Sequence, residues 1–442
     1  MQGITKKDLA KFAKEYDKNP INKVMANVLA NNQLTSSIRL TEPRVYNQYN
    51  FEIDIKTMSV CNQKSSGRCW VFAGLNVLRE IVAKKFNIKE FELSQNFFAF
   101  YDKLEKINYK LESVIELCDR DWDDRTLSHV LGEGIQDGGQ WNMLVNIIKK
   151  YGLVPKHAMD ETFQSSNTRE TNYVIANTIR KFAAVSSKLV KAGKMDEIRK
   201  LKDETLSKLY AVLCMAYGKP VEVFDFEYVD KDDKYHLDQG LTPLSFYEKY
   251  VGTSLDDYVS IINSPTKDKP FYNLFTVNYV GNVVDGRKIT YINLPIEEMK
   301  ELCLKQLKAG ELIWFGSDCG KYGNRETGVW DDKSYDYLNT LGIDMHMDKA
   351  DMLDYHVSSM DHAMVITGVS FKDGKVGKWK IENSWGPTAG NNGYYMMTDS
   401  WFDQFVYQAV INKKHLSKKQ LDVLKKKPIE LNPWDPMGTL AD

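Results

Sequence analysis

The apolar positions divide the chain into a helical first part and a strand-rich second part. An amphipathic helix is predicted to begin near Thr5, because apolar residues recur at helical spacing at Leu9, Phe12, Ala13 and Tyr16. The run CWVFAGLNVLREIVAKKF, which starts at Cys69, is apolar on nearly every face and predicts a helix at the centre of a domain. Two further helices are predicted in ELSQNFFAFYDKLEKIN, with Ser94 as its cap, and after the glycine-rich loop EGIQDGG.

Residues 165–218 differ in character, since they form long amphipathic patterns rich in Lys, Arg and Glu. They predict an inserted module of one or two helices. From about residue 220 onward, short runs rich in aromatic and β-branched residues predict strands in PVEVFDFEYV, YINLPI, ELIWFGSD, HAMVITGVSF, GKWKIENSWG and GYYMMTDSWF. Helices followed by an antiparallel, barrel-like sheet indicate an α+β protein. The chain closes with a basic helix and a proline-punctuated, extended end.

Composition adds a cellular setting to this picture. The 442 residues are 43% hydrophobic and 27% charged, which is typical of globular domains. The net charge of −1 gives no indication of a nucleic-acid or membrane partner, and no apolar run approaches the roughly 18 residues of a membrane span. The N-terminus lacks the pattern of a signal peptide. The six cysteines are scattered without metal-site spacing, so we expect mostly free thiols in a cytoplasmic protein without a metal.

One of these cysteines has an unusual context. Cys69 follows the flexible run Ser65–Arg68 and stands where the buried helix is expected to begin. A helix N-terminus offers partial positive charge and free N–H groups, which favour a thiolate. Most cysteines are small buried hydrophobes, so this context is what singles out Cys69 as a candidate nucleophile.

A nucleophilic thiolate needs a cationic partner that can also return a proton. Of the seven histidines, His362 heads the strand-like run HAMVITGV, and Asn383 ends the next predicted strand. Two neighbouring strands can bring this amide to the imidazole and set its tautomer. Gln63 precedes Cys69 by six positions, and its side-chain N–H, together with the Cys69 backbone N–H, could form an oxyanion hole. Each residue alone has a common structural explanation, but the four together indicate nucleophilic catalysis.

Three segments carry a family resemblance. QKSSGRCW, DHAMVITGV and IENSWG resemble the signature segments of the papain-like cysteine peptidases, with Arg68 where the papain signature has a small residue. The resemblance implies that Cys69 is the nucleophile, His362 the general base and acid, Asn383 the orienting residue and Gln63 the oxyanion donor. In the same way, DGGQW resembles the segment that pairs with extended substrate, which implies substrate binding by Gly138 and Gly139.

The chain resembles one branch of these peptidases most. The separation of Cys69 from His362 is far longer than in secreted papains, and the closing PWDPMGTLA matches the cytosolic bleomycin hydrolase and aminopeptidase C branch. This resemblance implies an aminopeptidase acting on peptides with a free N-terminus, without metal or organic cofactor. It also implies that a C-terminal arm enters the cleft, where a carboxylate of Ala441 or Asp442 meets the substrate ammonium. Assembly into a homohexamer through the helical insert is a further implication.

We therefore expect a papain-like fold with a helical subdomain, a β-barrel-like subdomain and helical insertions. Five segments are expected. They are an N-terminal helix and arm (1–60), a helical catalytic subdomain (61–160), an inserted helical module that could serve oligomerisation (161–220), a β-rich catalytic subdomain (221–425) and the C-terminal arm (426–442).

Other functions remain open at this stage. The chain could be a papain-fold oligomeric binding protein with nucleic-acid affinity and little peptidase activity. The basic stretch HLSKKQLDVLKKKP is the sequence feature that favours this hypothesis. A solvated helix or a contact between subunits explains that stretch better, because acidic residues balance its charge. A thiol transferase such as a transglutaminase would usually have Asp rather than Asn after His. The acidic run between Glu116 and Asp124 lacks the glycine and closing glutamate of a calcium loop, so we interpret it as a solvated face.

Overall fold

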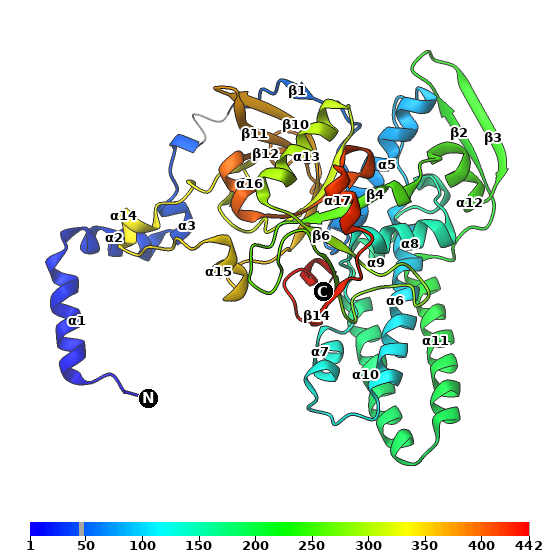
Figure 1. Cartoon of the computed structure of the whole chain (residues 1–442), viewed down its shortest axis with the longest axis horizontal. Helices are drawn as coiled ribbons and strands as arrows, with labels where there is room; N and C mark the ends of the chain where they lie inside the picture. Colours follow the sequence, from blue (N-terminus) through cyan, green and yellow to red (C-terminus); the bar gives the residue numbers. More distant parts are fainter. Residues whose placement is uncertain (44–47, 442) are drawn as a thin grey trace.

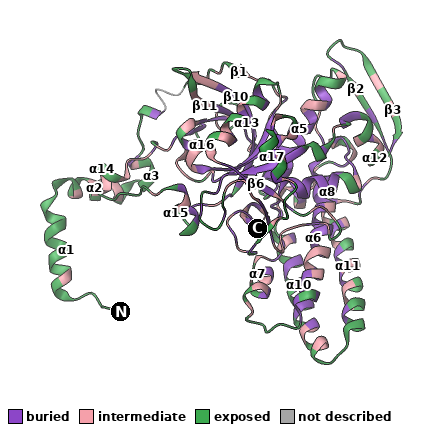
Figure 2. Cartoon of the chain, viewed as in Figure 1, coloured by how far each residue is buried: buried purple, intermediate pink, exposed green. Residues whose placement is uncertain are grey.

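The computed structural model describes residues 1–43 and 48–441 (Figure 1). Three N-terminal helices project from the rest of the molecule, with the bounds α1 Lys6–Lys18, α2 Pro20–Asn31 and α3 Leu34–Ser37. Thr5 caps α1, as predicted, but the polar arm expected after this helix contains two more helices. Asn19 caps α2 and Pro20 is its first residue, a start signal that the hydrophobic pattern does not register. None of the residues in these three helices is buried (Figure 2).

Four helices form the layer that carries Cys69. Their bounds are α5 Cys69–Phe86, α6 Gln95–Leu117, α7 Arg125–Glu133 and α8 Trp141–Tyr151. Helix α5 begins at Cys69, as predicted, and lies at the centre of the molecule, because its residues are apolar on nearly every face (Figure 2). Ser94 caps α6 by accepting a hydrogen bond from the backbone N–H of Phe97.

The inserted segment contains two long helices. Its bounds are α9 Phe163–Ser166, α10 Arg169–Lys191 and α11 Met195–Tyr217. Helices α10 and α11 run antiparallel, and both pack against α6 (Figure 1). The apolar stripe of each helix therefore faces its own subunit, which is the alternative that the amphipathic pattern left open.

A large sheet makes up most of the second part of the chain. Its strands follow the order β14-β5-β6-β4-β13-β7-β10-β11-β12-β9-β8, and β1 pairs with β10. The strand bounds are β1 Ile53–Asp54, β4 Tyr258–Ile262, β5 Leu274–Val277, β6 Tyr291–Asn293, β7 Ile313–Ser317, β8 Gly323–Asn324, β9 Val329–Trp330, β10 His362–Lys372, β11 Lys375–Glu382, β12 Tyr394–Thr398, β13 Val406–Asn412 and β14 Ile429–Leu431. A separate hairpin consists of β2 Phe224–Val229 and β3 Tyr235–Leu241 (Figure 1).

The sheet differs from the expected antiparallel one in two respects. Three strand pairs, β4 with β6, β5 with β14 and β9 with β12, are parallel, so the sheet is mixed. The expected strand GYYMMTDSWF ends at Thr398, whose side chain caps the helix Asp399–Phe405 (α16). The remaining helices have the bounds α12 Pro243–Phe246, α13 Ile296–Lys308, α14 Tyr337–Leu341, α15 Lys349–Asp354 and α17 Lys418–Val423.

Strand β10 separates two hydrophobic cores, because successive side chains of a strand point to opposite faces. Ala363 and Val365 pack in the core that contains α5, whereas Met364 and Ile366 pack in the core that contains α13. The sheet thus lies between α5 on one face and α13 on the other. This arrangement brings the start of β10 next to the start of α5.

Candidate active site

Cys69 lies at the junction of the helical layer and the sheet. It is the first residue of α5, and 4% of its surface is exposed. Its Sγ accepts a hydrogen bond from the backbone N–H of Ala363 in β10, at 3.4 Å. Because Ala363 follows His362, this contact places the two predicted catalytic side chains on adjoining elements.

His362 and Asn383 are joined by a hydrogen bond. His362 begins β10 and Asn383 directly follows the last residue of β11, and the antiparallel pairing of these strands brings both to the same end. The Nε2–H of His362 donates to Oδ1 of Asn383 at 2.8 Å, and this oxygen also accepts from the backbone N–H of Ser384. In the neutral imidazole, Nδ1 is therefore the ring nitrogen that can take a proton. The ring of Trp385 stacks on His362, with 4.9 Å between centroids.

The side chain of Gln63 is held at both ends of its amide. Its Oε1 accepts from Ser384 Oγ at 2.6 Å, and one N–H of Nε2 donates to the backbone carbonyl of Ser66 at 2.6 Å. One N–H of the amide is then left for another acceptor, in a direction set by these two contacts. Gln63 is buried, but it still lines the same cavity as Cys69.

A cavity of about 740 Å³ brings most of the predicted residues together. It is lined by Cys69, His362 and Gln63, and also by Gly138 and Leu440. Asn383 lies behind His362 rather than in the cavity wall. Ala441 lines a smaller neighbouring pocket beside Lys106, and Asp442 lies outside the described residues.

The two glycines predicted to bind substrate have different surroundings. A Cβ added at Gly138 would lie 2.3 Å from the carbonyl oxygen of Leu440, so the chain's own C-terminal segment runs against this residue. A Cβ added at Gly139 would lie 2.5 Å from the ring of Trp70. The structure thus places Gly138 at the cavity, whereas Gly139 is required by its close packing on an indole.

Burial opposes the charged forms of both Cys69 and His362. Burial raises the pKa of the Cys69 thiol to about 11, although the backbone N–H groups of Ala363 and Trp70 lower it. Burial also lowers the pKa of His362, and the hydrogen bond to Asn383 opposes this shift. Neither charge is favourable alone, because each group loses solvation when it ionises in a buried position. The N–H groups at the helix start thus lower the pKa of the thiol, but burial has the larger and opposite effect.

Sequence reasoning missed one wall of the cavity. The start of α10 contributes Thr168, Arg169, Asn172 and Tyr173 to the lining. The sequence predicted a role in oligomerisation for this segment. The signal that could have indicated the cavity is the pair Asn172 and Tyr173, whose polar groups lie one helical turn after Arg169. Asp361 is a second missed residue, which precedes His362, lines the cavity and raises the pKa of both His362 and Cys69.

The described part of the chain holds neither a metal-ligand cluster nor a membrane-spanning helix. Over residues 1–43 and 48–441, no group of three or more His, Cys, Asp and Glu side chains could hold a metal ion. In the acidic run, Asp124 caps α7 by accepting from the backbone N–H of Leu127. Among the described helices, none combines the length and the apolar character needed to cross a membrane.

A thiol that can pass its proton to a neighbouring imidazole is the nucleophile of cysteine hydrolases. The α+β architecture, with this thiol on the central helix and the imidazole on the sheet, is papain-like. The chain belongs to the Peptidase C1-like family, whose sequence profile matches residues 3–438.

Similar proteins with known names indicate which kind of peptidase this is. The chain is 46% identical to Aminopeptidase C of Lactobacillus delbrueckii subsp. lactis, over 97% of each chain, and 43% identical to Aminopeptidase C of Listeria monocytogenes serovar 1/2a, over 99% of each. The crystal structure of PepW from Lactobacillus rhamnosis HN001 superposes with a TM-score of 0.97 at 46% identity, over 99% of each chain. The protein is accordingly a cysteine-type aminopeptidase.

Proposed function

We propose that the protein releases N-terminal residues from peptides through an acyl-enzyme on Cys69. The sulfur attacks the carbonyl carbon of the first peptide bond while Nδ1 of His362 takes the thiol proton. The C–N bond of the tetrahedral intermediate then breaks, and His362 gives its proton to the leaving amine. A water molecule, deprotonated by His362, then attacks the thioester carbonyl. The C–S bond breaks, the N-terminal residue leaves as a free amino acid, and His362 returns the proton to the sulfur. The reaction needs no metal or organic cofactor.

Gln63 and the backbone N–H of Cys69 are the proposed donors to the oxyanion of the intermediate. The support is the fixed amide of Gln63, whose Oε1 and one N–H are already engaged by Ser384 and Ser66. Donors that are oriented before the reaction stabilise the developing charge without reorganisation. Asn383 is the proposed orienting residue, because its Oδ1 accepts from Nε2 of His362.

The C-terminal arm is proposed to restrict the enzyme to free N-termini. The observation that carries this proposal is the cavity that Cys69 and His362 share with Thr439 and Leu440. Thr439 donates a hydrogen bond to the carbonyl of Met360, at 2.9 Å. A substrate with more than one residue before the bond that is cleaved would collide with the arm. A carboxylate at the chain end would attract the α-ammonium of the substrate.

The arm is anchored well before it reaches the cavity. A buried ion pair joins Asp435 to Lys269 at 2.8 Å, and the hydroxyl of Tyr291 donates to the carbonyl of Met437 at 3.1 Å. Holding the arm in place therefore adds little entropy loss when substrate binds.

Deleting residues 439–442 is expected to enable cleavage of N-acetylated peptides. Cleavage of free aminoacyl amides should fall about 10- to 100-fold in kcat/KM, because a charged contact to the ammonium is lost. The measurement compares kcat/KM for leucyl and N-acetyl-leucyl fluorogenic amides in both proteins. Deletion of residues 1–4, at the other end of the chain, is the control. An unchanged ratio of blocked to free substrate would remove the arm from the mechanism.

We also propose that copies of this chain assemble, with a homohexamer as the expected form. The support is the N-terminal segment, in which Leu9, Phe12 and Tyr16 are 57%, 55% and 46% exposed on one face of α1. Helix α1 projects away from the body of its own subunit (Figure 2), and none of its residues is buried. Apolar surface of this kind is stabilised when a second copy covers it.

Replacing Leu9, Phe12 and Tyr16 together with serine is expected to reduce the assembly to smaller species. Light scattering coupled to gel filtration measures the mass against the 50.9 kDa of one chain. The matched control replaces Lys7, Lys11 and Lys14 with serine on the same helix, and we expect it to leave the mass unchanged. A wild-type protein of one-chain mass, or equal masses for both triple variants, would contradict the proposal.

A cytoplasmic location is the final part of this proposal. The support is the six cysteines, all of which carry free thiols in the structure. Such cysteine usage is typical of reducing compartments.

A further inference from the structure

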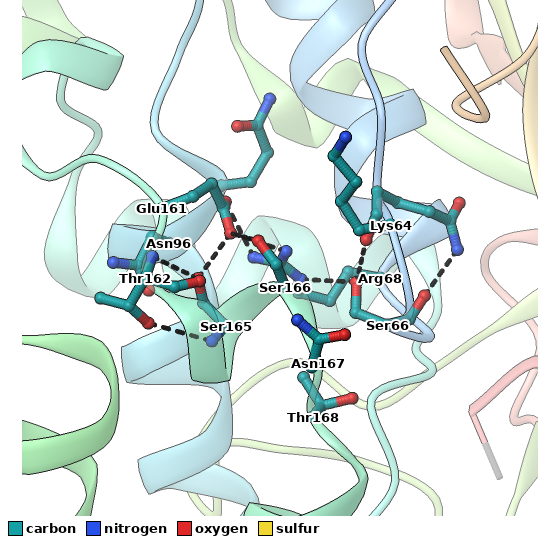
Figure 3. Close-up of polar contacts among 12 residues, drawn as sticks. Lys64, Ser66, Arg68, Asn96, Glu161, Thr162, Ser165, Ser166, Asn167 and Thr168 are labelled. Carbon is teal, nitrogen blue, oxygen red and sulfur yellow. Dashed lines mark hydrogen bonds and ion pairs between the residues drawn. The ribbon is translucent and has the colours of Figure 1, made fainter.

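An ion pair involves Arg68, the residue that precedes Cys69. The guanidinium of Arg68 donates from Nη1 and Nη2 to the two carboxylate oxygens of Glu161, at 3.0 and 2.8 Å (Figure 3). Only 3% of Arg68 is exposed, so its charge depends on this partner. The paired fork geometry also fixes the orientation of the guanidinium, which a single contact would not do.

Arg68 transmits this orientation to Gln63 through Ser66. The Nε–H of Arg68 donates to Oγ of Ser66 at 3.0 Å, and this hydroxyl donates to the backbone carbonyl of Gln63 at 2.6 Å. In return, the side-chain amide of Gln63 donates to the backbone carbonyl of Ser66 at 2.6 Å. The three residues therefore form a closed set of contacts, and a shift of Ser66 would turn the amide of Gln63.

Glu161 is itself held by the last two residues of α9, Ser165 and Ser166. Its Oε2 accepts hydrogen bonds from the hydroxyls of Ser165 and Ser166, at 2.5 and 3.3 Å (Figure 3). The backbone N–H of Ser65 donates to the carbonyl of Ser166 at 3.0 Å, which ties the two segments together a second time. The carboxylate thus occupies a defined position relative to the loop between Gln63 and Cys69.

We propose that Glu161 is a positioning residue for the oxyanion hole, acting through Arg68 and Ser66 on the amide of Gln63. The proposal rests on the oxyanion role assigned to Gln63 above. It explains why a large charged residue precedes the nucleophile, where a small residue would satisfy the backbone equally well. Glu161 does not touch the reacting atoms, so its effect should appear in the chemical step and not in substrate binding.

Two substitutions test this chain of contacts at different links. Glu161→Gln removes the charge that orients Arg68, and Ser66→Ala removes the hydroxyl between Arg68 and Gln63 without leaving a buried charge. Each is expected to lower kcat about 10- to 100-fold with little change in KM, because a small misplacement of a catalytic group has an effect of this size. Alkylation of Cys69 by iodoacetamide, which needs no oxyanion hole, should keep its wild-type rate in both variants.

The decisive comparison uses Gln63→Ala as the background. Gln63→Ala alone is expected to lower kcat about 10²- to 10³-fold, and adding Glu161→Gln or Ser66→Ala should lower it no further. Glu112→Gln is the matched control. Glu112 pairs with Arg199 through both carboxylate oxygens and is 25% exposed, against 20% for Glu161, but this ion pair joins α6 to α11. It should leave kcat unchanged, and thermal unfolding should find all variants folded.

The outcomes separate this proposal from the function that it rests on. Wild-type kcat in Glu161→Gln and Ser66→Ala, losses that multiply with that of Gln63→Ala, or a parallel fall in alkylation rate would each overturn the positioning role while leaving Gln63 in place. A wild-type kcat in Gln63→Ala would overturn the oxyanion assignment itself, and the positioning role with it.

Discussion

Replacing Cys69 with alanine is expected to lower kcat for aminoacyl amides by about 10⁶-fold, the effect seen when a hydrolase loses its nucleophile. Without the sulfur no acyl-enzyme forms, and His362 has no proton to accept. Substrate binding should persist, because the cavity wall and the arm do not depend on the thiol. Steady-state hydrolysis measures the loss, and binding of an uncleaved aminoacyl amide measures what remains.

Cys214→Ala is the matched control for this substitution. Cys214 is a half-buried thiol in α11 that does not line the cavity, so its removal should leave kcat unchanged. A stoichiometric thiol alkylator should label Cys69 selectively in the wild-type protein. The same treatment should leave the Cys69→Ala protein unlabelled. Substantial hydrolysis by Cys69→Ala, or equal labelling of all six thiols, would contradict the acyl-enzyme mechanism.

Replacing His362 with alanine is expected to slow alkylation of Cys69 at pH 7 by about 10⁴-fold. Burial, partly offset by the backbone N–H groups of Ala363 and Trp70, raises the pKa of the thiol to about 11, so about one molecule in 10⁴ would carry a thiolate at this pH without an imidazolium beside it. The rate in the variant should rise tenfold per pH unit up to about pH 11. In the wild-type protein the paired ionisation should hold the rate high at neutral pH.

The pH dependence distinguishes this explanation from thiolate formation by the helix alone. The measurement is the rate of iodoacetamide alkylation of Cys69 from pH 5 to 11, with and without His362. His346→Ala, at an exposed histidine, is the control and should follow the wild-type curve. If His362→Ala kept the neutral-pH rate of the wild-type protein, the helix N-terminus would be sufficient, and the role assigned to the imidazole would fall.

Several elements could be predicted because their information is local. The start of α5 at Cys69 follows from an apolar run after a flexible loop, and the caps at Thr5 and Ser94 follow from single polar residues before helical patterns. The second helix of the N-terminal segment was missed, although Asn19 and Pro20 mark its start. Parallel pairing of β9 with β12 could not be predicted, since a strand's own pattern does not reveal its partner.

The candidate site was predictable to a similar degree. Gln63, Cys69, His362 and Asn383 could be chosen from residue type, order and position at element boundaries, and their catalytic roles stay predictions that the experiments above address. The hydrogen bond between His362 and Asn383 agrees with that choice. The burial that raises the pKa of Cys69 could not be read from the sequence, because it depends on the packing of β10 against α5.

The sequence by itself determined which side chains could do chemistry and which segments would be helical, since residue type and short-range periodicity are properties of the chain alone. Only the tertiary structure decided that Glu161 meets Arg68, that α10 lines the cavity and that Leu440 lies against Gly138. These contacts join residues far apart in the chain. Their geometry follows from how the helices and the sheet pack, which no local pattern encodes.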